Sequence, residues 1–323
     1  MALLCLIFIF VGLDDWGVLE SSEARYALIA QEMLWRGDFI HPYFLYIPHY
    51  QKPPLTYQIT ALGVKIFGAN GYGFRFFLQI SLLLQVWFTY LIGKRLFTKK
   101  VGIYSAIMLA SFPLIIAAAR NLTTDSFLLT AALISTYFAV RYFYSNREKI
   151  NLYLFALSLG VGFLIKGFTV FVLPAALWIY LCFDRKERIK FDFHMLWAFL
   201  LFVLVGSSWY LVITSQNHAI LDYLIKRETI DRIANAKVFH RNEPFYYFLV
   251  FIPVLTLPWW CYLVNAYRKN CRSETRQVRY LLYTTFLFPL LIFSSSSSKR
   301  DFLHIAATAS VGLDYRFFSR SGL

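Results

Sequence analysis

A long run without a single charged side chain, FFLQISLLLQVWFTYLIG at Phe76–Gly93, most limits what this chain can fold into. Its length approaches the ~20 apolar residues that an α-helix needs to cross a bilayer. Only 15% of all residues are charged and 59% are hydrophobic, whereas about a quarter of a soluble domain is charged. The sequence therefore predicts an integral membrane protein.

Further apolar runs predict a bundle of such spans. In lipid every backbone polar group must be paired within the protein, and these runs lack the alternation of strands, so they are expected to be helices. The predicted fold class is all-α, a polytopic transmembrane helical bundle of about nine spans. The expected spans are roughly 1–13, 76–93, 101–119, 124–143, 151–165, 168–183, 195–215, 245–265 and 280–297.

The loops between these spans divide into two kinds by charge. Half of the 32 basic residues lie in short loops that alternate with the others, namely Gly93–Lys100, Arg141–Lys149, Asp184–Lys190 and Arg268–Arg279. Short loops rich in Lys and Arg stay in the cytoplasm. This rule accounts for the net charge of +14 without a nucleic-acid partner. The long loops 14–75 and 216–243 are then expected to be extracytoplasmic.

The first external loop is expected to hold two amphipathic helices at the membrane surface. Ser22 is the expected cap of the first helix. The apolar face of that helix is expected at Ala24, Leu28, Ile29, Leu34 and Trp35, and the polar face at Glu23, Arg25, Gln31 and Glu32. Pro53 and Pro54 cannot lie inside a helix and force an extended break. The second helix is expected from Leu55 to Phe67.

Several charged residues on the external side suit a site for a lipid phosphate. Charges at membrane depth are costly, so a functional role is the default for them. Lys52, Arg25 and Lys166 are candidates for binding the phosphate of a polyprenyl-phosphate donor. Glu23 and Asp125 are candidates for the base that acts on an acceptor hydroxyl. Each has a structural alternative. Glu23 and Asp125 can be charges at a helix start, and Lys52 can be a lysine that reaches the interface. Arg25 can pair with a neighbour or with lipid headgroups, and Lys166 can be a plain loop cation.

Aromatic and histidine side chains near these charges form a second set of candidates, for sugar or interface contacts. They are Tyr26, Tyr50, Tyr57 and His240. An aromatic belt at the membrane interface is the simpler alternative for them. The sequence has no HExxH and no CxxC pair, so neither a metal ion nor another cofactor is expected.

Motifs in sequence order resemble one family of membrane enzymes. They are SEARYALIAQEM, GDFIHP, YQKPPLTYQITA, FG, RF, TTDSFLL, GFLIKGF and SSSSSK, and they run from Leu13 to near Lys299. These blocks resemble the lipid-A aminoarabinose transferase and its relatives, which are similar to the protein O-mannosyltransferases. All of these belong to the GT-C class of membrane glycosyltransferases.

The resemblance implies transfer of a single sugar from a polyprenyl-phosphate donor to an acceptor on the outer face of the bacterial inner membrane. The implied acceptor is lipid A, another glycan or a protein. Lys52 and Arg25 then contact the phosphate, Asp125 fills an acidic position, and Lys166 lies in a lysine–glycine turn. The family commonly has Asp-Glu where this chain has Ser22 and Glu23. Either Glu23 or Asp125 is then the base, or the acceptor is a phosphate that needs none.

Residues 1–298 are expected to form the transmembrane glycosyltransferase domain, and 299–323 an atypical tail. The tail, RDFLHIAATASVGLDYRFFSRSGL, lacks the periodicity of a further span. A frameshift or truncation would produce it, so the chain is expected to be a fragment with intact donor motifs that is inactive alone. The competing function is a transporter or flippase of lipid-linked sugars; the lack of an internal repeat favours the enzyme.

Overall fold

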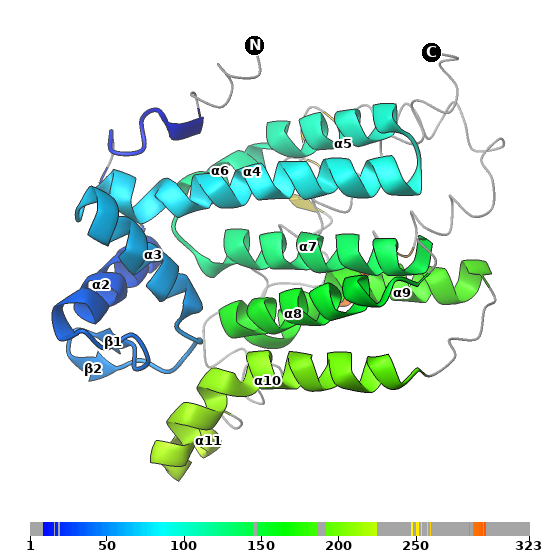
Figure 1. The fold of residues 1–323 in the computed structure, drawn as a ribbon. Coiled ribbons are helices and arrows are strands. Elements are labelled where there is room, and N and C mark those ends of the chain that lie inside the picture. Colours follow the sequence, from blue (N-terminus) through cyan, green and yellow to red (C-terminus); the bar gives the residue numbers. More distant parts are fainter. Residues whose placement is uncertain are drawn as a thin grey trace.

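The structure is a computed structural model that describes residues 9–224, apart from 16, 19, 145–146 and 186–191, together with isolated positions between 247 and 294. Figure 1 shows its longer helices side by side. The helices are α2 (Ser21–Arg36), α3 (Leu55–Phe67), α4 (Gly71–Leu96), α5 (Lys99–Ser111), α6 (Pro113–Arg120), α7 (Thr124–Tyr144), α8 (Lys149–Lys166), the 3-10 helix η1 (Gly167–Phe171), α9 (Val172–Arg185), α10 (Phe193–Gln216) and α11 (His218–Asp222). Two short strands, β1 (Tyr43–Phe44) and β2 (Ile47–Pro48), form an antiparallel hairpin between α2 and α3.

By length and apolar composition, four of the described helices can cross a membrane, or five if a bent pair counts as one span. They are Gly71–Leu96, Thr124–Tyr144, Lys149–Tyr180 and Phe193–Gln216, and the bent pair is Lys99–Ser111 with Pro113–Arg120. The chain is thus a mostly helical, multi-pass membrane protein, as its apolar runs predict. A total of about nine spans is not shown. The expected spans 1–13, 245–265 and 280–297 lie largely outside the described residues, as do loop residues 225–243 and the tail.

The stretch Lys149–Tyr180 turns back on itself instead of running straight. After α8, Gly167 adopts a φ of 69°, in the left-handed region that glycine tolerates without strain. Tyr180 of α9 lies in one cluster with Val140 of α7, and Phe155 of α8 packs against that cluster. Because Phe155 lies in the first half of α8, α9 returns toward the end where α8 begins. Two separate runs are also what the sequence predicts here.

One predicted span, 101–119, is broken instead of continuous. Its two halves, α5 and α6, are bent by 60° relative to each other. Phe112 between them has φ −68° and ψ 125°, the extended conformation that the residue before a proline prefers. Pro113 lacks the N–H that would continue α5, and it is well suited to begin a new helix. Hydropathy alone does not reveal this break, although the proline does.

The first loop helix, α2, does not have the predicted cap. It begins at Ser21 with Glu20 at the N-cap position. Ser22 lies inside the first turn, and its hydroxyl donates a hydrogen bond to Glu20 Oε2 at 2.9 Å. The prediction of Ser22 as the cap is therefore wrong, because its hydroxyl group binds the Glu20 carboxylate and not a backbone N–H of the helix.

The buried face of α2 also differs from the prediction. Tyr26 and Met33 are buried, and so are the carboxylates of Glu23 and Glu32, whereas Trp35 is 72% exposed. Apolar periodicity assigned both acids to the polar face. They are buried because each finds a partner inside the protein, and periodicity along one helix carries no information about such partners.

Glu32 holds the hairpin between α2 and α3. Its carboxylate oxygens accept the Tyr46 backbone N–H at 3.2 and 3.3 Å. Leu45 and Tyr46 at the tip have φ values of 52° and 67°, as the two central residues of a type I′ turn require. Neither residue is glycine, so each bears a conformation that costs about 1–2 kcal/mol. The Glu32 contact helps to offset that cost.

The second loop helix, α3, has the predicted bounds, Leu55–Phe67, and Pro54 is its N-cap. It packs against α4 through glycines. A β-carbon at Gly63 would overlap the Gly73 carbonyl oxygen, and one at Gly73 would overlap the Gly68 carbonyl oxygen. The two helices therefore meet backbone to backbone, an approach that only residues without a side chain permit.

Polar side chains join α4 to α7 inside the bundle. The hydroxyl oxygens of Ser81 and Thr130 lie 2.6 Å apart, and Gln85 Nε2 donates to the Ser126 carbonyl at 2.8 Å. All four side chains are buried. Hydrogen bonds of this kind help membrane helices to associate, because lipid provides no hydrophobic driving force between them.

The two ends of the bundle differ in character. Figure 1 shows α2, the hairpin and α3 gathered at one end, on the left of the view. At the other end Arg95 Nη2 donates to the Tyr144 carbonyl at 2.8 Å, and Lys149 Nζ lies 2.5 Å from His194 Nε2. These contacts join the end of α4 to that of α7 and the start of α8 to that of α10, at an end of the bundle that is rich in basic side chains. The positive-inside rule predicts that this basic end is cytoplasmic and that the first loop is external.

Candidate active site

Lys52 lies just before α3, in the break that Pro53 and Pro54 impose. Its ammonium group donates to Tyr26 Oη at 2.6 Å and to Thr124 Oγ1 at 3.2 Å. The same nitrogen lies 5.3 Å from the centroid of the Tyr26 ring. Tyr26 belongs to α2 and Thr124 begins α7, so two segments far apart in the sequence fix the position of one charged group.

Asp125, in the first turn of α7, pairs with Lys166 at the end of α8. Lys166 Nζ lies 2.5 Å from Asp125 Oδ1, and the two side chains remain 18% and 24% exposed. The Thr124 hydroxyl donates to the same Asp125 oxygen at 3.5 Å. A chain of polar contacts thus links four residues, Lys52, Thr124, Asp125 and Lys166. We call them the external cluster, after the side of the membrane that the positive-inside rule predicts for them.

The external cluster brings together residues that sequence analysis singled out separately. It holds two ammonium groups and one carboxylate, and all of them are partly open to solvent. Ammonium groups can bind a phosphate, and a carboxylate can accept a proton from a hydroxyl. The arrangement therefore has the groups that a phosphate-dependent group transfer needs.

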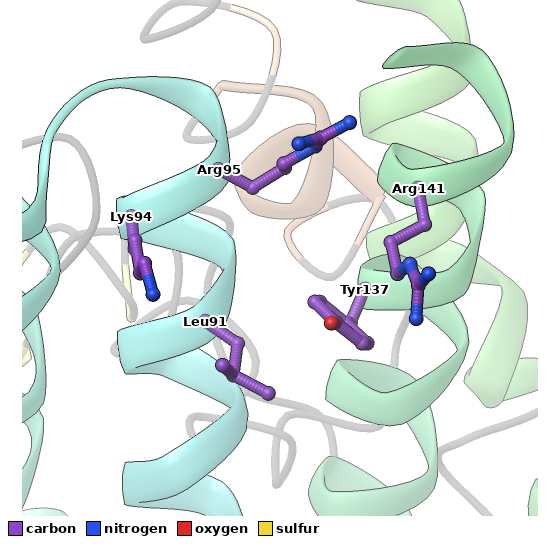
Figure 2. Close-up of a pocket in the computed structure, with 5 residues that line it drawn as sticks. All are labelled: Leu91, Lys94, Arg95, Tyr137 and Arg141. Carbon is purple, nitrogen blue, oxygen red and sulfur yellow. The ribbon is translucent and has the colours of Figure 1, made fainter. Parts of the chain in front are cut away.

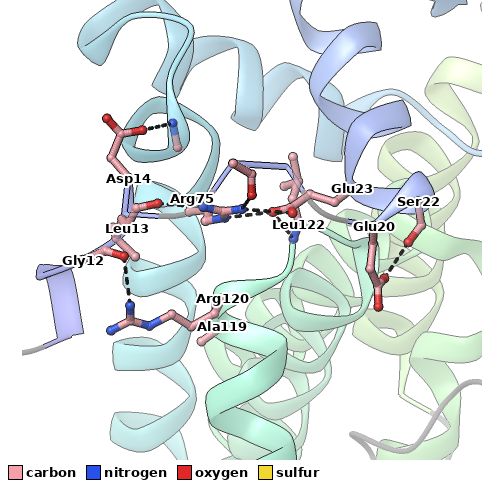
Figure 3. Close-up of polar contacts among 12 residues, drawn as sticks. Gly12, Leu13, Asp14, Glu20, Ser22, Glu23, Arg75, Ala119, Arg120 and Leu122 are labelled. Atoms are coloured by element: carbon pink, nitrogen blue, oxygen red, sulfur yellow. Dashed lines mark hydrogen bonds and ion pairs between the residues drawn. The ribbon is translucent and has the colours of Figure 1, made fainter.

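Glu23 has a different environment, as Figure 3 shows. Its two carboxylate oxygens accept hydrogen bonds from Arg75 Nε at 2.8 Å and Arg75 Nη2 at 3.0 Å. The Leu122 backbone N–H donates to Glu23 Oε1 at 3.2 Å. The side chains of Glu23 and Arg75 are only 4% and 1% exposed. This is a buried, bidentate ion pair between α2 and α4, extended to the segment that precedes α7.

Arg75 is the residue that the sequence analysis missed. Its guanidinium group also donates to the carbonyls of Leu13 at 2.7 Å and Gly17 at 3.0 Å. It therefore joins the chain before α2 to α2 itself and to α4. The available signal was the RF motif and the position of this arginine in the first turns of an apolar helix, where a charge needs a partner.

Arg25, a predicted phosphate contact, points to the hairpin. Its guanidinium carbon lies 5.9 Å from the centroid of the Phe44 ring. Within the described part of the chain, no hydrogen bond or ion pair joins it to Lys52, Asp125 or Lys166. Its role toward a phosphate stays a prediction.

The aromatic candidates line the first loop in two places. The rings of Tyr26 and Tyr57 lie 5.2 Å apart, and both side chains are buried. Tyr50 packs 6.4 Å from Trp209 of α10, and burial raises the pKa of its phenol, as do the neighbouring Tyr43 and Asp38. Tyr26 therefore contacts the Lys52 ammonium group, and Tyr57 packs against the Tyr26 ring. His240 lies outside the described residues.

Metal ligation has no support in the geometry of the part that the structure describes. No three His, Cys, Asp or Glu side chains gather there as metal ligands would. The site is built from cations, one partly exposed carboxylate and buried tyrosines.

The helical membrane bundle and the order of the motifs along it are those of the GT-C class of membrane glycosyltransferases. The chain belongs to the family described as dolichyl-phosphate-mannose-protein mannosyltransferase, whose sequence signature matches residues 51–212. The matched segment includes Lys52, Asp125 and Lys166, and thus the whole of the external cluster.

Curated relatives point to a narrower group. The chain is 29% identical over 298 residues to an undecaprenyl phosphate-alpha-4-amino-4-deoxy-L-arabinose arabinosyl transferase of Pseudomonas paraeruginosa, with 91% of this chain and 54% of that protein covered. The enzyme of the same name from Yersinia pestis is 29% identical over 309 residues, covering 92% of this chain and 55% of that protein. The chain spans about half the length of the curated relatives it matches.

The fold agrees with that of a solved structure. The crystal structure of ArnT from Cupriavidus metallidurans bound to undecaprenyl phosphate matches with a TM-score of 0.86 at 19% sequence identity. The match covers 99% of this chain and 59% of that one. At this level of identity the likeness establishes the fold.

Proposed function

We propose that this chain transfers a single sugar from a polyprenyl-phosphate donor to an acceptor on the extracytoplasmic face of the bacterial inner membrane. The acceptor is lipid A, another glycan or a protein. The observation that carries the proposal is the external cluster, in which two ammonium groups flank one carboxylate at the end of the bundle. Similarity to transferases named for an undecaprenyl phosphate donor supports the class of donor.

Lys52 and Lys166 bind the donor phosphate. A lysine ammonium group is a compact point charge, and each retains access to solvent through which a phosphate can approach. The ammonium of Lys166 is paired with Asp125, and the phosphate competes with that carboxylate for it. Donor binding therefore loosens the ion pair and leaves the carboxylate available to the acceptor. Arg25 is the third proposed phosphate contact.

Asp125 is the proposed base. The acceptor hydroxyl oxygen forms a bond to the anomeric carbon of the sugar, and the hydroxyl proton passes to the Asp125 carboxylate. The bond between that carbon and the phosphate oxygen breaks, and the polyprenyl phosphate leaves with the electron pair. A single displacement of this kind inverts the anomeric configuration. Glu23 is the second candidate, but its oxygens already accept hydrogen bonds from Arg75 and Leu122.

A transfer assay tests the proposal. The full chain, reconstituted in lipid nanodiscs, is mixed with radiolabelled polyprenyl-phosphate sugars and with lipid A or protein acceptors. Label in the acceptor with the parent, and none with Asp125→Asn, is the expected result. Asp38→Asn is the matched control, because Asp38 is an acid of the first loop, outside the external cluster, and its contacts lie in the His41 turn. Donor binding without any transfer would instead favour a transporter, a flippase or an inactive truncated transferase.

The extracytoplasmic placement of the site has a separate test. Leu45, at the hairpin tip, is 56% exposed. In a chain whose native cysteines are replaced by serine, Leu45→Cys is expected to react with an impermeant maleimide in intact cells. Lys99→Cys, at the basic end, is expected to react only after the cells are opened. The reverse pattern would invert the topology and overturn the proposed function.

A further inference from the structure

A pocket of about 280 Å³ lies at the basic end of the bundle, far from the external cluster. Figure 2 shows it between α4 and α7. It is lined by Leu91, Lys94, Arg95, Tyr137 and Arg141. Lys94 and Arg95 lie in the last turn of α4, and Arg141 lies in the last turn of α7. The proposed transfer reaction makes no use of these residues.

The cations at the pocket have different partners. Arg95 Nη2 donates to the Tyr144 carbonyl of α7 at 2.8 Å, so that it reaches across from α4. Arg141 Nη2 lies 3.5 Å from Glu148 Oε2 in an exposed pair, with side chains 38% and 51% exposed. Lys94 Nζ lies 5.8 Å from the centroid of the Tyr90 ring. Exposed ion pairs contribute little to stability, so Glu148 restrains Arg141 only weakly.

The surroundings of the pocket suit a lipid headgroup. The basic end is the predicted cytoplasmic side, and helix ends place these side chains at the level of the lipid headgroups. Leu84 and Trp87 are 36% and 56% exposed on α4, and they precede Leu91 at helical spacing. Together with Leu91, which lines the pocket, they offer an apolar surface that runs along α4 toward the hydrocarbon region. The Tyr137 ring has the amphipathic character that suits the interface.

We propose that this pocket binds the phosphate headgroup of an anionic phospholipid of the cytoplasmic leaflet. Arg95 and Arg141 face the phosphate from two helices, Lys94 adds a third charge, and an acyl chain lies along Leu84, Trp87 and Leu91. Basic pockets between membrane helices on the cytoplasmic side recognise such headgroups. The bound lipid joins the ends of α4 and α7. This binding is independent of the proposed sugar transfer.

Binding of the headgroup at this place depends on side-chain charge and not on the backbone. The last turns of α4 and α7 expose backbone carbonyls, and the carboxyl end of a helix disfavours an anion. The backbone therefore contributes nothing favourable, and loss of the cations cannot be compensated. At about 1 kcal/mol for each basic residue near the surface, neutralising all three weakens binding of an anionic lipid by about 100-fold.

Native mass spectrometry of the purified full chain tests this inference. Phosphatidylglycerol, which is anionic, is titrated against phosphatidylcholine, which has no net charge, and the retained lipid is counted. The parent is expected to retain phosphatidylglycerol selectively. The triple variant Lys94→Gln, Arg95→Gln, Arg141→Gln is expected to lose that selectivity. The matched control, Lys99→Gln, Lys100→Gln, Arg147→Gln, removes the same charge at the same end outside the pocket and is expected to keep it.

Three results would overturn the inference. Equal loss in the triple variant and the matched control would show that total charge matters and the pocket does not. Equal retention of phosphatidylcholine by the parent would remove the role of charge. Displacement of the lipid by inorganic phosphate alone would show a site for a free anion. If the triple variant does not fold, the single variants serve, each with an expected loss of about fivefold.

Discussion

Two acid–base pairs lie at the end of the bundle that carries the first loop, and they differ in burial. The side chains of Glu23 and Arg75 are 4% and 1% exposed, whereas those of Asp125 and Lys166 are 24% and 18% exposed. The Glu23 pair is bidentate, with added contacts to three backbone groups. Breaking a pair of that kind leaves a buried charge without compensation. The Asp125 pair can exchange partners with a ligand at lower cost.

This difference separates the two acids by role. Both occupy the first turn of a helix, and the sequence gives no reason to prefer one as the base. Their environments do give a reason, because a base needs access to the acceptor and oxygens that are not already saturated. We therefore expect Glu23 to maintain the fold and Asp125 to take part in the reaction.

The largest effect is expected at Asp125. Asp125→Asn removes the proton acceptor while preserving the shape of the side chain, so the transfer rate is expected to fall by about 10²–10⁴-fold. The free energy of unfolding is expected to change by only about 0–1 kcal/mol, since the pair is partly exposed. Initial rates and denaturant unfolding measure the two quantities. If the variant transfers sugar at the parent's rate, Asp125 is not the base. An acceptor whose attacking group is a phosphate would also need no base.

The converse is expected at Arg75. Arg75→Met leaves the Glu23 carboxylate buried and unpaired, and it is expected to lower the free energy of unfolding by about 3–5 kcal/mol. The double variant Glu23→Leu, Arg75→Met is expected to recover part of this loss, because no uncompensated charge remains. Denaturant unfolding in detergent provides the measurement, with the exposed Lys65→Met as control. A double variant no more stable than Arg75→Met would contradict the importance of the pair.

A smaller effect is expected at Lys52, where the change concerns donor binding. Lys52→Ala is expected to weaken binding of a polyprenyl phosphate by about 1.5–3 kcal/mol, the usual range for a charge-assisted hydrogen bond. Lys52→Arg retains the charge but changes its shape, so part of the affinity is expected to remain. Lys65→Ala, at the end of α3, is the matched control. Unchanged donor affinity in Lys52→Ala would exclude a phosphate contact.

The smallest effect is expected at Asp38, an acid of the first loop. Burial acts to raise its pKa, but hydrogen bonds from the backbone N–H groups of His41 and Ile40 and from the His41 ring lower it below 3.8 overall. A lowered pKa in the folded state means that this stabilisation is present above pH 3.8 and is lost as the pH falls through the lowered value. The difference in thermal stability between parent and Asp38→Asn is therefore expected to shrink in acid. If the stability difference grows in acid instead, the pKa of Asp38 is raised in the folded state and the prediction is wrong.

Prediction from the sequence was most accurate where a local signal decides the structure. The prolines before α3 and the glycine after it mark its ends, so Leu55–Phe67 could be predicted residue by residue. Hydropathy also located α4, α7 and α10, because the length of an apolar run reflects the thickness of the bilayer. Hydropathy does not predict the break at Pro113, because the mean over a long apolar run is insensitive to a single proline.

Contacts between distant segments could not be predicted in the same way. Lys52 and Asp125 were singled out by residue type, but their connection through Thr124 is a property of the packed helices. The role of Arg75 could not be predicted, because its partner, Glu23, is far away in the sequence and lies on another helix. The burial of Glu23 and Glu32 on α2 could not be predicted for the same reason, because a carboxylate is buried only where a partner from elsewhere in the chain binds it.

The glycine contact between α3 and α4 affects how precisely the Lys52 ammonium group is positioned. α3 has 13 residues, so at the usual rise it is a rigid rod of about 20 Å, with Lys52 before one end and Gly63 toward the other. A methyl group at Gly63 would push the rod away from α4 and swing the ammonium group at its opposite end. Misplacing a reacting group by about 1 Å can slow a reaction on the order of 10²-fold. The lack of a side chain at Gly63, which does not contact Lys52, therefore controls how precisely the Lys52 ammonium group is positioned.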